Sequence, residues 1–239
     1  MTATSGVTHK SSQRTRNAHT AAASTTPAPD VVSLGQGDAM PLKIGVMGGA
    51  AGATANDPET LALARQVGEA IAKSGNILVT GACPGVPQAA VEGAHDQHGI
   101  VIGISPADSA AAHVQEYHSP TEGYTAILYT GMGLMMRDVL NIRSCDMVVV
   151  IGGRGGTLNE EEIASKEGKP IGVLRNSGGT AAHLRGIKKE LGEEIPQNMV
   201  FGSHPDKLVS DLIAVARKYP ASFHVDGKVI DQPVKSDKG

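Results

Sequence analysis

Three short glycine-rich loops, each placed directly after an apolar run, constrain the fold of this 239-residue chain more than any other feature. The apolar runs occupy residues 42–47, 76–80 and 147–151, and the loops after them read GGAAG, GACPG and GGRGGT. Main-chain amides in such loops can point into a cleft, and the helix that follows adds partial positive charge at its first turn. A single loop of this kind can be a plain tight turn. Three of them on one edge of a sheet indicate an anion-binding site.

Strand and helix patterns alternate along the middle of the chain. Strands are predicted at residues 42–47, 76–80, 100–104, 126–130, 147–151, 170–174 and 198–201. Helices are predicted at residues 58–73, 85–98, 132–144, 157–167 and 205–219, with a loop at 105–123. Strands separated by helices predict right-handed crossovers, and therefore a single α/β domain with a doubly wound, Rossmann-like parallel sheet. Ligands of such sheets bind outside the carboxyl ends of the strands, where the three loops are expected.

The two ends of the chain depart from this pattern. Residues 1–40 are rich in Ser, Thr and Ala and contain no acidic residue before Asp30. This composition predicts a disordered extension, although a basic, Ser-rich and acid-poor segment is also typical of an organelle transit peptide. Residues 221–239 are polar and predict a flexible tail. The folded domain is therefore expected at residues 41–220.

Composition excludes several classes of protein. A net charge of −3 and an aromatic content of 3% provide neither a basic field nor stacking platforms for nucleic acid. No apolar stretch approaches the roughly 18 residues that span a membrane. Cys83 and Cys145 form no disulfide or zinc pattern, and His95 and His98 lack a third metal ligand. We therefore expect a cytoplasmic protein with no bound metal or cofactor and no nucleic-acid or membrane partner.

Of two common nucleotide sites, the dinucleotide site is disfavoured and the P-loop is excluded. A dinucleotide site needs an acidic residue at the end of its second strand, where this chain has Thr80, Gly81 and Ala82. The motif G-x-x-x-x-G-K-[ST] is absent, which excludes a P-loop. The loop residues expected to bind a phosphate or nucleotide are Gly48, Gly49, Gly81, Gly85, Gly153, Arg154, Gly155, Gly156 and Thr157.

Glu160 and Arg137 are the candidate side chains for chemistry. The sequence TLNE fits the capping box, in which Thr157 caps the helix and Glu160 bonds back to it. In that case Glu160 stabilises the helix by about 1 kcal/mol and has no other role. Alternatively its carboxylate faces a ligand, and one carboxylate cannot easily do both. Arg137 is expected near the ligand edge, where a guanidinium can bind phosphate through two hydrogen bonds.

Two segments resemble one known family. TGACPGVPQAAVEGA at residues 80–94 resembles the TGGGPGxMEAAxxGA stretch of the LOG-like ("lonely guy") Rossmann proteins. MMRDVLNIRSCDMVVVIGGRGGTLNE at residues 135–160 resembles their M-x-x-R-K…SD…PGGxGTxxE stretch. Many such proteins carry an older lysine decarboxylase label. The resemblance covers most of residues 42–175 and places Arg137 and Glu160 on the family's functional Arg and Glu.

The resemblance implies a homodimeric, nucleotide-binding domain. The best-known members cleave the N-glycosidic bond of cytokinin riboside 5′-monophosphates, relatives act on AMP-like nucleotides, and others only bind, including a carrier of the molybdenum cofactor. We expect a phosphoribohydrolase of nucleoside 5′-monophosphates, in which Glu160 stabilises the oxocarbenium-like state and Arg137 orients the substrate. The alternative is a non-catalytic carrier or sensor of a phosphorylated ligand, such as the molybdenum cofactor. Met132, Met135 and Met136 are expected in the core or the dimer interface.

The sequence also departs from the family pattern. Ala82 and Cys83 replace two glycines, and Asp138 follows Arg137 where Lys is usual. In the third loop Gly152 replaces Pro and Arg154 replaces Gly. These changes indicate the less characterised branch of the family, in which binding is a firmer expectation than turnover.

Overall fold

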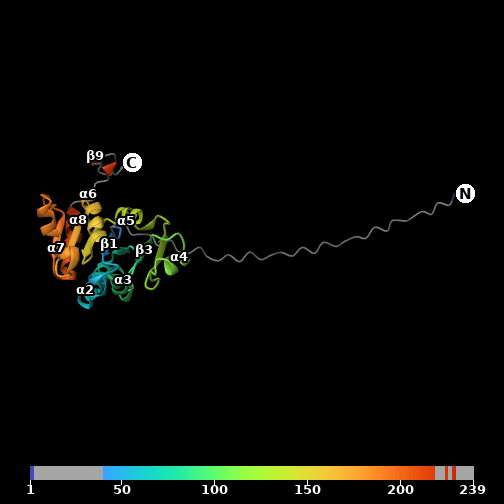
Figure 1. The fold of residues 1–239 in the computed structure, drawn as a ribbon, viewed down its shortest axis with the longest axis horizontal. Coiled ribbons are helices and arrows are strands. Elements are labelled where there is room, and N and C mark those ends of the chain that lie inside the picture. The colour runs from blue at the N-terminus through green and yellow to red at the C-terminus, as the bar shows by residue number, and fades with distance from the viewer. Residues whose placement is uncertain (3–39, 219–223, 226–227, 230–239) are drawn as a thin grey trace, which may run out of the picture. The chain divides into compact units, whose positions relative to one another are not determined.

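The protein contains one large parallel sheet of seven strands, in the order β4-β3-β2-β1-β5-β6-β7 (Figure 1). The computed structural model describes residues 1–2, 40–218, 224–225 and 228–229. The strands are β1 (Lys43–Gly48), β2 (Ile77–Thr80), β3 (Val101–Ser105), β4 (Ala126–Tyr129), β5 (Met147–Ile151), β6 (Ile171–Leu174) and β7 (Met199–Gly202). Every neighbouring pair in this sheet is parallel. The predicted α/β class and doubly wound parallel sheet are confirmed.

Eight helices connect or follow the strands within the described residues. They are α1 (Ala53–Asn56), α2 (Pro58–Lys73), α3 (Val86–Asp96), α4 (Ala110–Gln115), α5 (Gly133–Ser144), α6 (Gly155–Lys166), α7 (Gly179–Glu190) and α8 (Pro205–Lys218). The start of α2 is the one predicted, because Asp57 accepts a hydrogen bond from the Thr60 amide and Pro58 occupies the first turn.

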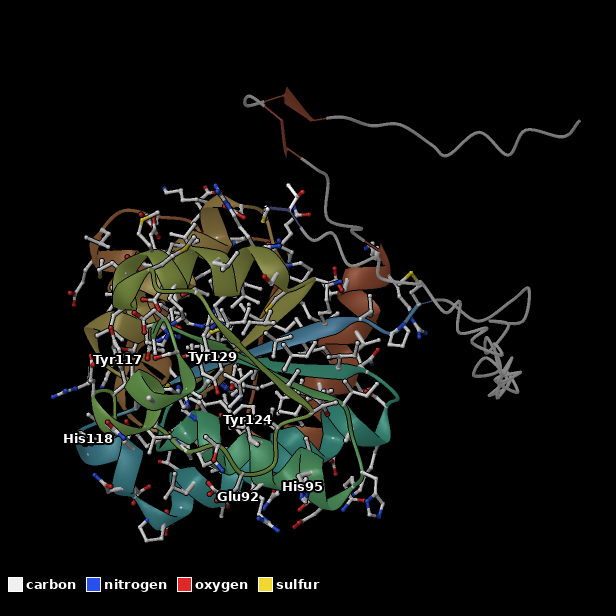
Figure 2. The ribbon with its side chains drawn as sticks, turned by 90° about the vertical axis from the view of Figure 1, so that its right-hand side faces the viewer. Glu92, His95, Tyr117, His118, Tyr124 and Tyr129 are labelled. Atoms are coloured by element: carbon white, nitrogen blue, oxygen red, sulfur yellow. The ribbon has the colours of Figure 1, made fainter. Side chains whose placement is uncertain are left out.

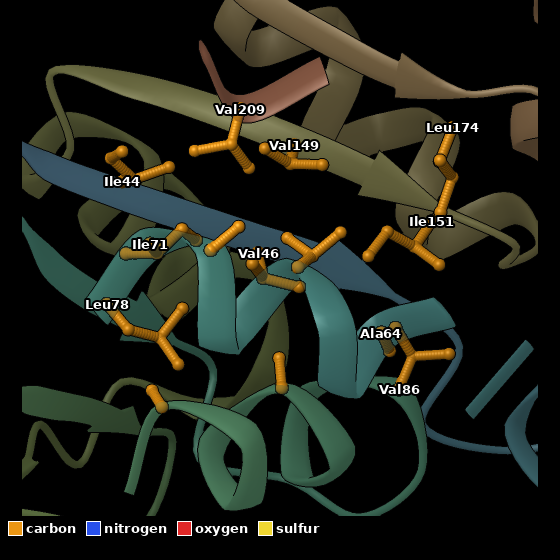
Figure 3. Packing of buried hydrophobic residues seen from close by; sticks show 14 of the residues in the cluster. Ile44, Val46, Ala64, Ile71, Leu78, Val86, Val149, Ile151, Leu174 and Val209 are labelled. Carbon is orange, nitrogen blue, oxygen red and sulfur yellow. The ribbon is translucent and has the colours of Figure 1, made fainter. Parts of the chain in front are cut away.

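The sheet is covered on both faces, as its unbroken apolar strands require. On one face, Val46 and Val149 pack with Ile71 of α2, Val86 of α3 and Val209 of α8 (Figure 3). Alternate residues of the same strands point to the other face, because side chains in a strand alternate in direction. The second face forms its own core with apolar residues of α5, α6 and α7. Each large apolar side chain that becomes fully buried stabilises the fold by about 2 kcal/mol.

The strand order contains a switch point between β1 and β5. From β1 the chain moves outward through β2, β3 and β4, and then returns to place β5 on the other side of β1. The loops after β1 and β5 therefore leave neighbouring strands in opposite directions and open a crevice between them. Ligands of open α/β sheets bind at this location. The fold thus predicts a site between residues 49–52 and 152–154.

Three helices of the structure fall where no helix was predicted. The short helix α1 lies between the predicted strand 42–47 and the predicted helix 58–73, and α4 lies within the predicted loop 105–123. Helix α7 lies between the predicted strands 170–174 and 198–201. Helix α7 follows Gly178 without a side-chain cap and contains Gly186. Glycine at both places weakens the sequence signal, because it lowers helix propensity by about 1 kcal/mol. Helix α7 forms nonetheless because Ala181 and Leu184 bury against the sheet.

The segment after β3 is organised by a buried histidine. His113 of α4 contacts the Ser105 hydroxyl through Nδ1 at 2.8 Å and the Pro120 carbonyl through Nε2 at 2.9 Å. The carbonyl can only accept, so Nε2 carries the proton and the Ser105 hydroxyl donates to Nδ1. The ring of Tyr129 packs edge-on against the His113 ring at 5.7 Å. Tyr129 is labelled in Figure 2, together with Tyr124, which also follows β3 in the chain.

The predicted ends of the chain lie largely outside the described residues. Nearly all of the predicted disordered extension at 1–40 does so. Of the predicted tail at 221–239, the structure describes only two-residue strands, β8 (His224–Val225) and β9 (Lys228–Val229), which pair antiparallel. Both assignments stay predictions. Among the described helices, none has the length and apolarity needed to cross a membrane.

Candidate functional site

A cavity of about 360 Å³ opens at the switch point of the sheet. The loops after β1, β2 and β5 all contribute to its wall, together with the first turns of α5 and α6. The three glycine-rich loops therefore meet at one place, as the sequence predicts. The lining residues are Val46, Gly48, Gly49, Ala50, Ala51, Gly81, Cys83, Pro87, Leu134, Met135, Arg137, Asp138, Arg154, Gly156, Thr157 and Glu160.

The loop after β5 is held in shape by side chains from elsewhere in the chain. The amide of Gly152 donates to the Ser177 hydroxyl at 2.7 Å, and the amide of Gly153 donates to the Thr54 hydroxyl at 3.1 Å. The Gly153 carbonyl in turn accepts from the amide of Thr180 at 3.0 Å. The amide of Gly153, expected to contact a phosphate, thus already has an acceptor within the protein. These bonds fix the loop through contacts within the protein.

The amides that follow are free to bind a ligand. Helix α6 begins at Gly155, so the amides of Gly155, Gly156 and Thr157 have no acceptor within the helix. None of them donates to another described residue, and both glycines are exposed. A Cβ built on either glycine would have no atom within 4 Å, so the space in front of them is open. Free amides at a helix N-terminus form an anion-binding arrangement.

The capping-box interpretation of Thr157 and Glu160 is wrong. The residue before α6 is Arg154, which makes no side-chain capping bond, and Thr157 lies within the first turn of the helix. The Thr157 side chain packs over Gly153, where a Cβ would lie 2.2 Å from its Oγ1. Glu160 lies in the second turn, makes no capping bond and lines the cavity.

Arg137 lies at the buried end of the cavity rather than at its mouth. Its side chain is 7% exposed and Nη1 lies 3.5 Å from Asp138 Oδ1. The guanidinium packs directly on Gly81, whose Cβ position would lie 1.9 Å from Nη1. Glycine at position 81 is therefore required for this placement of the arginine. Within the described part of the chain, Arg137 Nε has no hydrogen-bond partner.

Glu160 and Asp138 face this arginine as a pair of buried acids. Burial raises the pKa of Glu160 to about 8, and the negative charge of Asp138 raises it further than Arg137 lowers it. Burial also raises the pKa of Asp138, against the opposing effects of Arg137 and of a hydrogen bond from Asn159. Two carboxyl groups beside one guanidinium cannot both be fully compensated. Glu160 therefore keeps its proton at neutral pH.

We expect this proton to make the stability of the fold depend on pH. Glu160 titrates at about 8 in the folded protein, against an ordinary value of 4.5. The folded state therefore binds more protons between these values, and the free energy of unfolding falls as the pH rises through this window. In Glu160→Gln this fall should be reduced by up to about 1.4 kcal/mol per pH unit, measured by urea unfolding between pH 5 and 8. The exposed Glu190→Gln variant is the control, and parallel curves for Glu160→Gln and wild type would contradict the assignment.

The neighbouring glutamates of α6 serve a different contact. Glu161 is buried and lies 3.2 Å from Nζ of Lys188 on α7, and Glu162 lies 3.7 Å from the same atom. Glu193 completes the group at 3.1 Å. Of the three consecutive glutamates, only Glu160 therefore lines the cavity. The ion pairs of the other two hold α6 against α7.

Cys83 and Arg154 also line the cavity and differ in exposure. Cys83 is half-buried, and burial raises the pKa of its thiol to about 11 despite the charge of Arg137. It is therefore a neutral thiol at physiological pH and a poor nucleophile. Arg154 is exposed at the mouth, and its guanidinium lies against Gly52 of the loop after β1. It brings a positive charge to the end of the cavity where the free amides lie.

Of the eleven residues predicted for the site, eight line the cavity. They are Gly48, Gly49, Gly81, Arg137, Arg154, Gly156, Thr157 and Glu160. Gly85, Gly153 and Gly155 do not line it. Gly85 instead precedes α3 with a φ of 76°, and a Cβ there would lie 2.5 Å from the Gly49 carbonyl oxygen. Contacts between any of the eleven and a ligand stay predictions.

Sequence reasoning missed the residues that support the site. Thr54 and Ser177 are far from the third loop in sequence, and no local pattern marks them as acceptors for its amides. Asp138 stood out in the sequence because the LOG-like family usually has Lys at this position. The sequence analysis did not predict that its side chain lines the cavity. No group of three or more His, Cys, Asp or Glu residues in the described chain could hold a metal ion.

Comparison with protein families finds a match over most of the chain. The model of the SLOG cluster4 family matches residues 41–207. A protein of Archaeoglobus fulgidus without an assigned function is 34% identical over 134 residues, which cover 56% of this chain and 80% of that relative. The family resemblance inferred from residues 80–94 and 135–160 is thereby confirmed.

Comparison with solved structures finds the same fold. The molybdenum cofactor binding protein of Rippkaea orientalis is 29% identical, with a TM-score of 0.59, over 73% of this chain and 96% of that one. The molybdenum cofactor carrier protein of Chlamydomonas reinhardtii is 27% identical, with a TM-score of 0.56, over 73% of this chain and 99% of that one. Both matches span nearly the whole of the other chain.

Proposed function

We propose that this chain, which belongs to the SLOG cluster4 family, binds a small phosphate-bearing ligand and functions as a carrier or sensor of it. The ligand class is a nucleotide or a nucleotide-like cofactor such as the molybdenum cofactor. Its phosphate is bound at the mouth of the cavity, and the remainder of the molecule extends toward Arg137 and Glu160.

One observation carries this proposal: the free amides at the start of α6 face open space at the switch point of the sheet. The helix dipole adds about half a positive charge at the same place. Ala50 and Ala51 of the loop after β1 line the opposite wall and are exposed. A phosphate between the two loops would receive main-chain hydrogen bonds, with the charge of Arg154 beside it.

The proposal of a carrier is supported by the two structural relatives named for the molybdenum cofactor. It is also supported by the protonation of the carboxyl and thiol groups that line the cavity. Glu160 is protonated at neutral pH, and Cys83 is a neutral thiol. Neither group is then a charged nucleophile.

The test is to titrate the purified protein with AMP, GMP, ribose 5-phosphate and adenosine by isothermal calorimetry. We expect the phosphorylated compounds to bind and adenosine to bind at least about tenfold more weakly than AMP, since it lacks the phosphate contacts. Molybdenum released from the protein after expression in a cofactor-producing host, measured by mass spectrometry, identifies a natural cofactor ligand. If adenosine binds as tightly as AMP, the phosphate site is absent.

A second candidate function, cleavage of the N-glycosidic bond of nucleoside 5′-monophosphates, is favoured by the position of Glu160 in the cavity. A protonated carboxyl can donate its proton to a leaving base, and the carboxylate that results can stabilise an oxocarbenium-like sugar. Release of ribose 5-phosphate from AMP or GMP that disappears in Glu160→Ala would support the hydrolase. Binding without release supports the carrier.

We also propose that α5 forms a homodimer interface. Its apolar side chains Met132, Met135, Met136 and Leu140 recur at helical spacing and are exposed. Three of its polar side chains, Arg137, Asp138 and Asn141, are by contrast buried. This arrangement is the reverse of an ordinary surface helix. An uncharged apolar stripe can pair with its own copy across a two-fold axis.

The dimer is tested by Met136→Glu, which places a charge in this stripe without touching the cavity. Light scattering with size-exclusion chromatography should give a dimer for the wild type and a monomer for the variant. Leu191→Glu is the matched control, because Leu191 is equally apolar and 69% exposed but lies at the end of α7. A wild-type protein that is monomeric at micromolar concentration would contradict the proposal.

A further inference from the structure

The cavity has two chemically different ends. Its mouth is formed by exposed residues that favour an anion, namely Arg154, Gly156 and the free amides around it. Its inner end is formed by Arg137, Asp138 and Glu160, each less than a tenth exposed. Glu160 lies five residues after Gly155, so the two ends are about 7.5 Å apart along the axis of α6. A ligand that fills the cavity must therefore differ in polarity from one end to the other.

The two acids of the inner end have few hydrogen-bond partners within the described residues. Asp138 is 3.5 Å from the Arg137 guanidinium and accepts from Asn159. Glu160 makes no hydrogen bond or ion pair with another described residue, although it is more than nine-tenths buried. Buried carboxyl groups in native proteins are hydrogen-bonded, because an unpaired one costs several kcal/mol. Donors for this pair are therefore expected to come from the ligand.

We infer that the inner end binds a 2-amino-4-oxopyrimidine ring, as in guanine or a pterin, through Asp138 and Glu160. This inference rests on the proposed function, since the phosphate at the mouth sets which end of the ligand enters the cavity. The ring presents two adjacent N–H groups, one in the ring and one on the 2-amino substituent. The Asp138 carboxylate can accept both in parallel, and the carbonyl oxygen of the protonated Glu160 carboxyl can accept the remaining amino hydrogen.

Other bases fit this end less well. Adenine presents an amino donor beside a ring acceptor, so its acceptor would face an oxygen of the Asp138 carboxylate. Hypoxanthine retains the ring N–H but lacks the 2-amino group, which leaves one carboxyl group without a donor. A site built to bind a donor discriminates strongly against an analogue that lacks it, because its own buried polar group is then unpaired. Asp138 is therefore the residue expected to determine specificity.

The inference is tested with four probes: GMP, IMP, AMP and a pterin carrying a phosphate on its side chain. GMP or the pterin phosphate should bind wild-type protein at least about tenfold more tightly than IMP or AMP. The comparison of GMP with the pterin phosphate then distinguishes a nucleotide from a pterin ligand. In Asp138→Asn the side-chain amide offers one donor and one acceptor, which matches adenine. The preference for GMP over AMP should fall at least about tenfold in this variant.

The outcomes separate this inference from the proposed function. Asp211→Asn, an exposed substitution on α8, is the matched control and should bind like the wild type. If all four probes bind the wild type with similar affinity, the phosphate site stands and the ring assignment is wrong. If none of them binds, the proposed function itself fails. The wild-type comparison remains decisive even if the Asp138→Asn variant does not fold.

Discussion

Replacing Gly156 with aspartate is expected to weaken phosphate-dependent binding by about 100-fold or more while the protein stays folded. Gly156 is exposed in the first turn of α6, and a Cβ at this position would meet no atom within 4 Å. The new carboxylate would therefore fit without strain, in the space proposed for the phosphate. It would satisfy the free amides itself and repel a second anion. Calorimetric titration with AMP and GMP measures the loss.

The matched control is Gly186→Asp on α7. Gly186 is also an exposed helical glycine with open space around its Cβ position, but it lies away from the cavity. Its variant should bind AMP and GMP as the wild type does, with a similar melting temperature. Unchanged binding in Gly156→Asp would mean that the α6 N-terminus is not the anion site, even if the protein binds nucleotides elsewhere.

Much of the fold could be predicted because the parallel sheet leaves a strong local signal. The run at β5 is apolar at every position because both faces of the strand are covered, and all five residues are fully buried. The meeting of the three loops followed from the same argument, since parallel strands end on one edge. These features depend on residues that are close in sequence, or on a rule that holds for the whole sheet.

The parts that sequence reasoning missed depend on contacts between distant residues. The sequence predicts that the amide of Gly153 binds a phosphate. In the structure this amide donates to the hydroxyl of Thr54, which lies 99 positions away in sequence. The start of α6 at Gly155 was predicted two residues too late, because Thr157 and Glu160 fit a local capping pattern that the helix does not use. In each case a tertiary contact overrides a local preference, and a single sequence does not display such contacts.

Helix α5 links the site to the proposed assembly. One side of the helix places Arg137 and Asp138 in the cavity, and the other side carries the exposed methionines. Leu134 and Met135 belong to both regions, since they are exposed and also line the cavity. A partner copy on this helix would therefore narrow the mouth of the cavity. Ligand binding and dimerisation should consequently strengthen each other.

The largest expected loss of stability comes from Gly68→Ala, at the contact between α2 and α3. A Cβ on Gly68 would lie 1.9 Å from the main-chain oxygen of Ala90, which no side-chain rotation can relieve. The two helices would have to separate, with a cost of about 3 kcal/mol or more. Helix α3 also connects to the site, because the amide of Val86 donates to the Gly49 carbonyl at 3.0 Å. We therefore expect weaker AMP binding as well.

In contrast to Gly68→Ala, the same glycine-to-alanine change at Gly186 is expected to stabilise the protein. This glycine is helical and exposed, with no atom near its Cβ position, so alanine should stabilise the protein by about 0.5–1 kcal/mol through helix propensity. Urea unfolding monitored by circular dichroism measures both variants against the wild type. Equal stabilities for the two variants would show that α2 and α3 do not pack with their backbones in contact. In that case the position of the loop after β1, which depends on this packing through Val86, would also have to be revised.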